Sequence, residues 1–154
     1  MLNKIFPLTF LAFGVLLSAC SKDEFARPNI ETLRAEIFEK VNEHRISIGL
    51  IELEASDLCT QMANEHSQNM ANGQVEFSHD GFKERFDAAS TEVGASSAGE
   101  NLASNFTSAD QLVKGWLSSP PHKENLEGDY THMGIGIATD GNGNTYFTQF
   151  LIKI

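Results

Sequence analysis

Two histidines and one glutamate of this sequence have the side-chain types that metal or acid–base chemistry needs. His79, Glu100 and His122 each stand in a short polar stretch of turn-like composition, rather than on the apolar face of a helix or strand. Two neutral imidazoles and one carboxylate can hold Zn²⁺ or another divalent cation and leave a coordination position open to water. Without a metal, a His–Glu pair could act as a general base. The sequence predicts a polar cleft built from these three residues.

Other roles for these residues stay open. His79 and Glu100 could hydrogen-bond to each other, or to loop backbone, and serve only to tie loops to helices. Two minor candidates for the cleft are Asn101, expected mainly as a backbone brace, and His132. The side chain of His132 is expected to point opposite to that of Met133, because successive residues of a strand face opposite sides.

The remaining histidines are expected outside the cleft. His66 is four residues from both Met62 and Met70, which favours a buried packing role on the inward side of a helix. His44 has charged neighbours and is expected to be solvated. The sequence contains no Gly-x-Ser-x-Gly elbow, no zinc-protease helix motif and no phosphate-binding loop, so no catalytic residue is assigned.

Hydrophobic periodicity and capping signals predict the elements that must position these residues. Helices are expected over 30–48, from Ser56 to about Gly73, around Phe82 and Phe86, from Ser108 through Trp116, and over 123–126. Pro120 and Pro121 are expected to end the fourth helix, because proline cannot continue a helix from its interior.

A β-hairpin is predicted near the C-terminus. Met133, Ile135 and Ile137 alternate with Gly134, Gly136 and Ala138, and the small second face would let a helix lie close. Residues 140–144 have turn composition, and 145–152 form the return strand. Helices before and after a central antiparallel sheet predict an α+β domain with helices layered on the sheet.

Taken together, four motifs resemble the CAP superfamily, also called SCP/TAPS or pathogenesis-related-1-like. They are Phe77-Ser78-His79, Gly99-Glu100-Asn101-Leu102, Trp116 through His122, and Thr131-His132-Met133-Gly134-Ile135-Gly136, and the resemblance covers residues 33 to 154. It implies a three-layer α-β-α sandwich and a cleft with two histidines and two acids. By motif, His79, Glu100 and His122 match three of these four positions.

The fourth position of the family's cleft departs from the pattern. Where the resemblance places a second acid, this chain has Ser118, Ser119, Pro120 and Pro121, and Glu124 does not align with the missing carboxylate. A mechanism that needs four residues is therefore not supported. The departure favours binding over catalysis.

The N-terminus predicts export and lipidation. Lys4 precedes an apolar run from Ile5 to Leu17, too short for a stable spanning helix, which indicates a signal peptide. Leu17-Ser18-Ala19-Cys20 resembles a bacterial lipobox, so residues 1–19 would be removed and Cys20 lipidated with acyl chains such as palmitate. An ordinary secretory signal with a chance cysteine is the alternative. Residues 20–29 read as a tether, and 30–154 as one CAP (SCP) domain.

These signals place the protein in a bacterial cell envelope, outside the cytoplasm, with the membrane as partner through Cys20. Ser21 resembles an outer-membrane sorting signal if the organism is Gram-negative. With 21 acidic and 11 basic residues, the chain has a net charge of −10, which argues against nucleic acid as a partner. If Cys20 is lipidated, Cys59 has no disulfide partner, and its neighbours predict burial on a helix face.

Three functions are compatible with the sequence. The first is a lipid-anchored, extracytoplasmic CAP domain whose His/Glu cleft binds a divalent cation and a ligand such as a lipid, glycan or peptide. The second is a metal-dependent or His/Glu-dependent hydrolase acting on peptides or cell-envelope material. The third is an interaction module without a small ligand.

Overall fold

The computed structural model describes residues 29–154. The predicted signal peptide (1–19), the lipidation site Cys20 and all but the last residue of the tether (20–29) lie outside this range. The elements, in chain order, are α1 (Ile30–Ser47), β1 (Glu54–Ala55), α2 (Asp57–Ala71), α3 (Phe82–Val93), β2 (Ser97–Ser104), α4 (Ala109–Leu117), α5 (Pro120–Leu126), β3 (His132–Thr139) and β4 (Thr145–Lys153).

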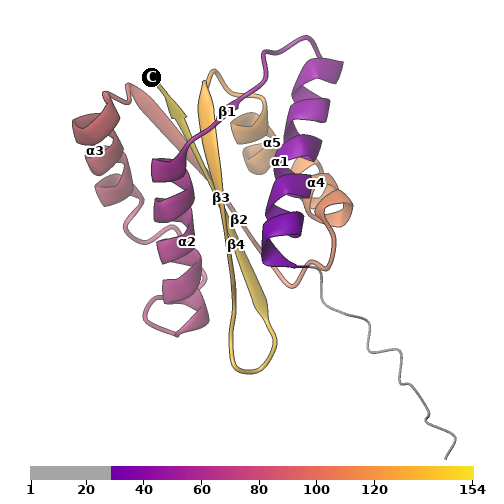
Figure 1. Ribbon diagram of the computed structural model, residues 1–154, viewed down its shortest axis with the longest axis vertical. Coiled ribbons are helices and arrows are strands. Elements are labelled where there is room, and N and C mark those ends of the chain that lie inside the picture. The colour runs from indigo at the N-terminus through magenta and orange to yellow at the C-terminus, as the bar shows by residue number, and fades with distance from the viewer. Residues whose placement is uncertain (1–28) are drawn as a thin grey trace, which may run out of the picture.

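Helices cover both faces of the sheet. Figure 1 shows α2 and α3 on one side of the strands, and α1, α4 and α5 on the other. The predicted α+β class and three-layer α-β-α arrangement are thus confirmed. None of the helices within residues 29–154 combines the length and the apolar character that crossing a membrane requires.

The sheet has four strands in the order β1-β3-β4-β2. β3 and β4 form the predicted antiparallel hairpin, and β2 is antiparallel to β4. β1 runs parallel to β3 over two residue pairs, so the sheet is mixed rather than purely antiparallel as predicted. β2 therefore forms one edge of the sheet, and β3 forms the other edge where β1 stops.

The strand β2 was not predicted from the sequence. Its eight residues, SAGENLAS, are mostly small or polar and have low intrinsic preference for strands. They nevertheless pair along their whole length with β4, from Ser97 opposite Lys153 to Ser104 opposite Tyr146. Pairing with an apolar neighbour strand overrides the local preference. Glu100 and Asn101 consequently lie in a regular strand, not in the turn-like stretch that their composition suggests.

Two helix ends decide where the second histidine lies. Ser108 caps α4 as predicted, and its hydroxyl oxygen accepts a hydrogen bond from the Gln111 backbone N–H at 3.3 Å. Pro120 and Pro121 are the first two residues of α5, where the missing backbone N–H is not needed. The two prolines therefore follow the end of α4, as predicted, and also begin α5. His122 is thus the third residue of a helix, and not part of a loop.

Helix α2 packs very closely on the hairpin. A Cβ placed on Gly134 would lie 2.1 Å from the backbone nitrogen of Thr60, and one on Gly136 would lie 2.1 Å from the carbonyl carbon of Ala63. Only glycine permits this approach, which confirms the close helix predicted from the small residues of this strand. Cys59, on the same helix, is fully buried as predicted, and burial raises the pKa of its thiol.

Each face of the sheet has its own apolar core. On the α1 side the largest buried side chains include Trp116, Phe147 and Leu112, and on the α2 side they include Phe150 and Ile152. Burying one large apolar side chain stabilises a fold by about 1.5–3 kcal/mol. These two cores hold the helical layers against the sheet. They thereby fix the positions of the side chains that α3 and α5 place at the β2 edge.

Candidate functional site

The site is built around the outer edge of β2. Three of its backbone carbonyls point away from β4, and each accepts a hydrogen bond from a side chain. These bonds run from Trp116 Nε1 to Leu102 O (3.0 Å), from Asn125 Nδ2 to Glu100 O (2.9 Å) and from the Tyr130 hydroxyl to Ala98 O (3.4 Å). Side chains from α4, α5 and the segment after α5 thus close this edge and leave no carbonyl of the three unpaired.

Alternation along β2 sends the side chains of Glu100 and Asn101 to opposite faces of the sheet. Glu100 contacts Arg85 of α3, whereas Asn101 contacts Asn125 of α5. The adjacent positions 100 and 101 therefore connect the strand to both helical layers. This explains how one short motif can hold groups that come from different sides of the sheet.

His79 is held from behind by Glu100. Nδ1 of His79 lies 2.8 Å from Oε1 of Glu100, with 54 % of the imidazole side chain exposed and only 1 % of the carboxylate side chain. Arg85 grips the same carboxylate: its Nε donates to Oε2 and its Nη2 to Oε1, both at 2.9 Å. The imidazole therefore faces solvent from a fixed, buried ion pair.

His122 reaches the same region from α5. The Asn101 amide donates to the His122 carbonyl at 3.1 Å and to Gln149 Oε1 at 2.9 Å, which pins the first turn of α5 to the sheet. Burial, and secondly the nearby charge of His79, lower the pKa of His122. His122 therefore tends to stay neutral, the form that binds metal ions.

A small hollow opens beside His79. It has a volume of about 280 Å³ and is lined by His79, Phe82, Ala98, Gly99, Glu100 and Asn125. Its lining comes from the loop before α3, from α3, from β2 and from α5, so both layers contribute. A Cβ on Gly99 would lie 2.5 Å from the Tyr130 hydroxyl, so glycine lets that ring close the edge.

Both oxygens of Glu100, which the sequence predicts as a metal ligand beside the two histidines, are already engaged by other side chains. Both of its oxygens accept hydrogen bonds from Arg85, and Oε1 also faces His79 Nδ1. Within residues 29–154, no group of three or more His, Cys, Asp or Glu residues gathers closely enough to hold a metal ion. Glu100 therefore lies behind His79, in the place that a carboxylate partner of a histidine takes, and is not free to act as a ligand itself.

The other predicted residues lie elsewhere or act as braces. Asn101 bonds to backbone and to amide groups, as expected for a brace. His132 begins β3 on the opposite side of the sheet, where its Nε2 lies 3.6 Å from Glu54 Oε2 and its Nδ1 lies 2.8 Å from the Thr131 hydroxyl. These contacts keep His132 at the β1 side of β3.

The two histidines expected outside the cleft are both there. His66 is 3 % exposed, and its Nε2 lies 2.8 Å from the Ser78 carbonyl oxygen, which confirms the buried packing role. The expectation that His44 is solvated is wrong, because its side chain is 18 % exposed and its Nε2 lies 2.8 Å from Glu127 Oε1. The residue at the C-terminal boundary of α5 covers it, and sequence neighbours could not reveal that.

Arg85 and Asn125 are the site residues that sequence reasoning missed. A signal for Arg85 exists, since it lies three residues after Phe82 on the same face of the predicted short helix. A cation on the face that covers the sheet requires a buried anion as its partner. Asn125 carries no such signal, because an asparagine near a helix end is common for reasons of capping alone.

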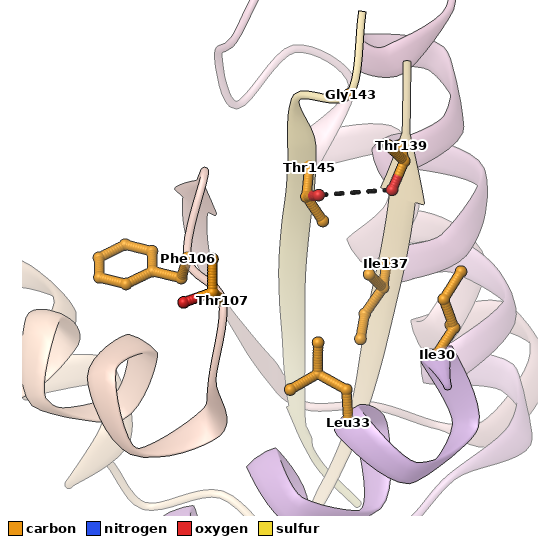
Figure 2. Close-up of a pocket in the computed structure, with 8 residues that line it drawn as sticks. All are labelled: Ile30, Leu33, Phe106, Thr107, Ile137, Thr139, Gly143 and Thr145. Carbon is orange, nitrogen blue, oxygen red and sulfur yellow. Dashed lines mark hydrogen bonds between the residues drawn. The ribbon is translucent and has the colours of Figure 1, made fainter. Parts of the chain in front are cut away.

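A second, larger hollow lies apart from His79 and His122. Figure 2 shows it between the first turns of α1, the segment after β2 and the β3–β4 hairpin. Its volume is about 340 Å³, and its lining is Ile30, Leu33, Phe106, Thr107, Ile137, Thr139, Gly143 and Thr145. It shares no lining residue with the hollow beside His79.

Comparisons with known proteins agree with this architecture. Residues 38–150 match the family model of the cysteine-rich secretory protein (CAP) family. The chain is 33 % identical over 128 residues to the uncharacterized membrane protein YlbC of Bacillus subtilis, covering 79 % of this chain and 35 % of that protein. It is 27 % identical over 132 residues to YkwD of the same bacterium, covering 83 % and 50 %. The chain thus spans about a third to a half of these relatives.

Two solved structures share the fold. An extracellular SCP-domain protein from Bacillus anthracis aligns with a TM-score of 0.69 and 27 % identity, over 80 % of this chain and 41 % of that one. An outer surface protein from Borrelia burgdorferi aligns with a TM-score of 0.70 and 21 % identity, over 81 % and 95 %. The family model covers most of the described residues, including both histidines and the β2 edge. The chain therefore belongs to the CAP, or cysteine-rich secretory protein, family.

Proposed function

We propose that this protein is a lipid-anchored, extracytoplasmic CAP-domain protein whose His79–His122 pair binds a divalent cation, Zn²⁺ being the best-suited ion, next to a ligand-binding surface. One observation carries the proposal. His79 is more than half exposed, yet its Nδ1 is fixed on a buried carboxylate. A side chain that is held so firmly while its other nitrogen faces solvent is arranged for contact with something outside the fold.

The chemistry of the pair supports a cation. Neutral imidazole is a common ligand of Zn²⁺, and the lowered pKa of His122 favours its neutral form. The acidic surface of the chain, with a net charge of −10, raises the local concentration of cations. Glu100 would increase the basicity of His79 through Nδ1 and would not itself ligate. Solvent or a ligand would complete the coordination shell.

Location outside the cytoplasm is supported by the N-terminal sequence and by the relatives. Leu17-Ser18-Ala19-Cys20 resembles a lipobox. The similar proteins are described as a membrane protein, an extracellular protein and an outer surface protein. Several acyl chains on Cys20 would hold the domain firmly at a membrane surface. Intact-mass analysis of membrane-extracted protein should give an acylated Cys20 as first residue, and Cys20→Ser should remove the acyl mass; a different mature start would contradict the anchor.

Binding is favoured over hydrolysis. The hydroxyl oxygen of Ser78 accepts from the Asp80 backbone N–H, and the hydroxyl of Ser118 donates to the Lys114 carbonyl. Neither serine is bonded to His79 or His122 within the described residues, so no activated nucleophile is assembled there. The separate hollow in Figure 2, which lies apart from the histidines, would suit a ligand with an apolar part better than a glycan, since its lining residues Ile30, Leu33 and Ile137 have side chains that offer no hydrogen bonds.

Zinc-dependent stabilisation tests the cation site. At about 100 times its dissociation constant, Zn²⁺ should raise the free energy of unfolding by about 2.7 kcal/mol, because it binds only the folded chain. His79→Ala and His122→Ala should each abolish that rise in a thermal melt. His44→Ala is the matched control, because this imidazole pairs with Glu127 and not with Glu100, and it should respond as the parent. The effect should fade below about pH 6, where protons compete with the metal. A parental response from both site variants would refute the cation site.

A further inference from the structure

We infer that Arg85 is a positioning residue of this site, which fixes Glu100 and through it the tautomer and the orientation of His79. Its consequence for cation binding rests on the proposed function. The positioning role itself does not rest on it, because the tautomer of His79 can be measured in metal-free protein. The proposal concerns a chain of three side chains that runs from α3 through β2 to the loop before α3.

The geometry of the contact is that of a fork. Nε of Arg85 donates to Oε2 of Glu100 and Nη2 donates to Oε1, both at 2.9 Å, and Nη2 also lies 2.6 Å from Oε2. Two nitrogens of one planar guanidinium thus span both oxygens of the carboxylate. The Arg85 side chain is 13 % exposed and that of Glu100 is 1 % exposed. The pair is therefore shielded from water, unlike the exposed i,i+4 pair of Lys83 and Asp87 on the same helix.

Arg85 also holds the loop that carries His79. Its Nη1 donates to the backbone carbonyl of Asp80 at 2.9 Å, one residue after the histidine. The same guanidinium thus grips the carboxylate behind the imidazole and the backbone beside it. A side chain that merely neutralised Glu100 would not need this third bond.

Gly81 provides room for this arrangement. It lies directly before α3 with a φ of 73°, in the left-handed region that favours glycine. A Cβ at this position would lie 3.2 Å from Nη1 of Arg85. Both the backbone conformation and the absence of a side chain at Gly81 are therefore matched to the position of the guanidinium.

The consequence for His79 follows from donor and acceptor counting. An ionised carboxylate only accepts hydrogen bonds, so the nitrogen that faces Glu100 Oε1 must carry the proton. Neutral His79 is then the Nδ1–H tautomer, and the lone pair is on the exposed Nε2, where a cation or a ligand donor can reach it. Without Arg85, Glu100 would lose two donors and its counter-charge, and nothing would hold its oxygen toward Nδ1. The imidazole could then adopt either tautomer.

Imidazole nitrogen NMR of ¹⁵N-labelled, metal-free protein at about pH 8 tests this inference, because the two nitrogens of a neutral histidine give distinct protonated and lone-pair signals. The parent should show a protonated Nδ1 and a lone-pair Nε2 for His79. Arg85→Gln should move both signals toward a mixture of tautomers, and Arg85→Lys, which keeps the charge but loses the fork, should move them less. Arg34→Gln is the matched control, since Arg34 bonds to the other edge of the sheet, and should leave them unchanged.

Two outcomes would overturn the inference. One is a parental His79 with Nε2 protonated. The other is unmoved His79 signals in folded Arg85→Gln or, if that variant does not fold, in Arg85→Lys. Zinc titration adds a second readout: Arg85→Gln should weaken binding by about 10- to 100-fold, the usual effect of losing a partner behind a metal-binding histidine. If the parent binds no zinc, the proposed function fails, while the NMR result on Arg85 stands by itself.

Discussion

The two edges of the sheet are both closed by side chains, but in different ways. Beyond the short β1, the edge of β3 is closed by Arg34, whose Nε donates to the Ile135 carbonyl at 2.9 Å, and by Asn64, whose side-chain oxygen accepts from the Ile137 N–H at 3.2 Å. At the β2 edge three carbonyls are covered in the same manner, and in addition the Glu100 side chain joins a second arginine to an exposed imidazole.

This difference separates a structural closure from a functional one. At the β3 edge Arg34 and Asn64 bond to the strand only through its backbone, which is how proteins prevent strands from pairing with other chains. Arg34 also bonds to Asn64 and to the exposed carboxylate of Glu31 on its own helix. At the β2 edge the contacts extend through Glu100 to the imidazole of His79. Closing the edge does not require this imidazole, because more than half of it is exposed to solvent. Backbone capping explains the bond from Arg34 to β3, but it does not explain why Arg85 grips the buried carboxylate of a β2 side chain.

The largest expected effect is at the centre of the functional edge. Glu100→Ala should lower the free energy of unfolding by about 4 kcal/mol, because it leaves the largely buried Arg85 without its anion. Glu100→Gln, which keeps the shape and one acceptor, should cost less. Urea unfolding measures both. A loss of under about 1 kcal/mol for the alanine variant would show that the pair behaves as an exposed one and would remove the contrast between the edges.

Substitution on the face of β3 that packs against α2 should lower the free energy of unfolding nearly as much. Gly134→Ala would place a methyl group 2.1 Å from the Thr60 backbone, and backbone in the middle of a helix cannot move aside cheaply. We expect a loss of about 3 kcal/mol from overpacking. Gly141→Ala is the matched control, because nothing lies within 4 Å of a Cβ there. Similar thermal melts for the two variants would show that α2 can retreat from the sheet.

The same glycines show how far the sequence predicted the fold. The alternation of small and apolar residues from Met133 onward predicted both the strand and its close helix, because that pattern is local. β2 could not be predicted in this way, since its stability comes from pairing with β4 and from the side chains that close its edge. The layered arrangement needed the family resemblance in addition to the pattern.

The site was predicted in part. His79 and Glu100 do meet, with Nδ1 and Oε1 2.8 Å apart, and the charge of His79 reaches His122. Their roles could not be predicted, because a carboxylate beside a metal and one behind a histidine look the same in sequence. The position of Arg85 decides between them, and its contact with Glu100 depends on how α3 lies on the sheet.

A smaller effect is expected at the structural edge. Arg34→Met keeps the apolar stem but removes the donors to Ile135 O and Asn64 Oδ1 and the exposed pair with Glu31, so the free energy of unfolding should fall by about 1–2 kcal/mol. The zinc response should not change. The matched comparison is Arg85→Met, which should lose both stability and zinc binding. Loss of zinc binding in Arg34→Met would mean that both edges serve the site.

The smallest effect concerns His66, a residue of α2 that bonds to the loop carrying His79. Burial lowers the pKa of His66 first, the positive charge of Arg85 lowers it further, and Glu100 and the bond to the Ser78 carbonyl only partly oppose this. The charge of His79 also lowers it. Because the unfolded chain, with a pKa near 6.5, then binds more protons than the folded one, His66 contributes stability above about pH 6.5 that is lost as the pH falls below it.

Denaturation series between about pH 8 and pH 5 should therefore show stability falling with acidification, and His66→Gln should reduce that dependence. The pKa of His122 is lowered as well, so it contributes with the same sign, and part of the slope should remain in His66→Gln and disappear only when His122→Gln is added. An unchanged slope in the double variant would mean that neither imidazole is desolvated enough to matter. The loop that carries His79 would then be more open to water than the bond from His66 to Ser78 indicates, and the β2 edge would lose the rigidity that distinguishes it from the β3 edge.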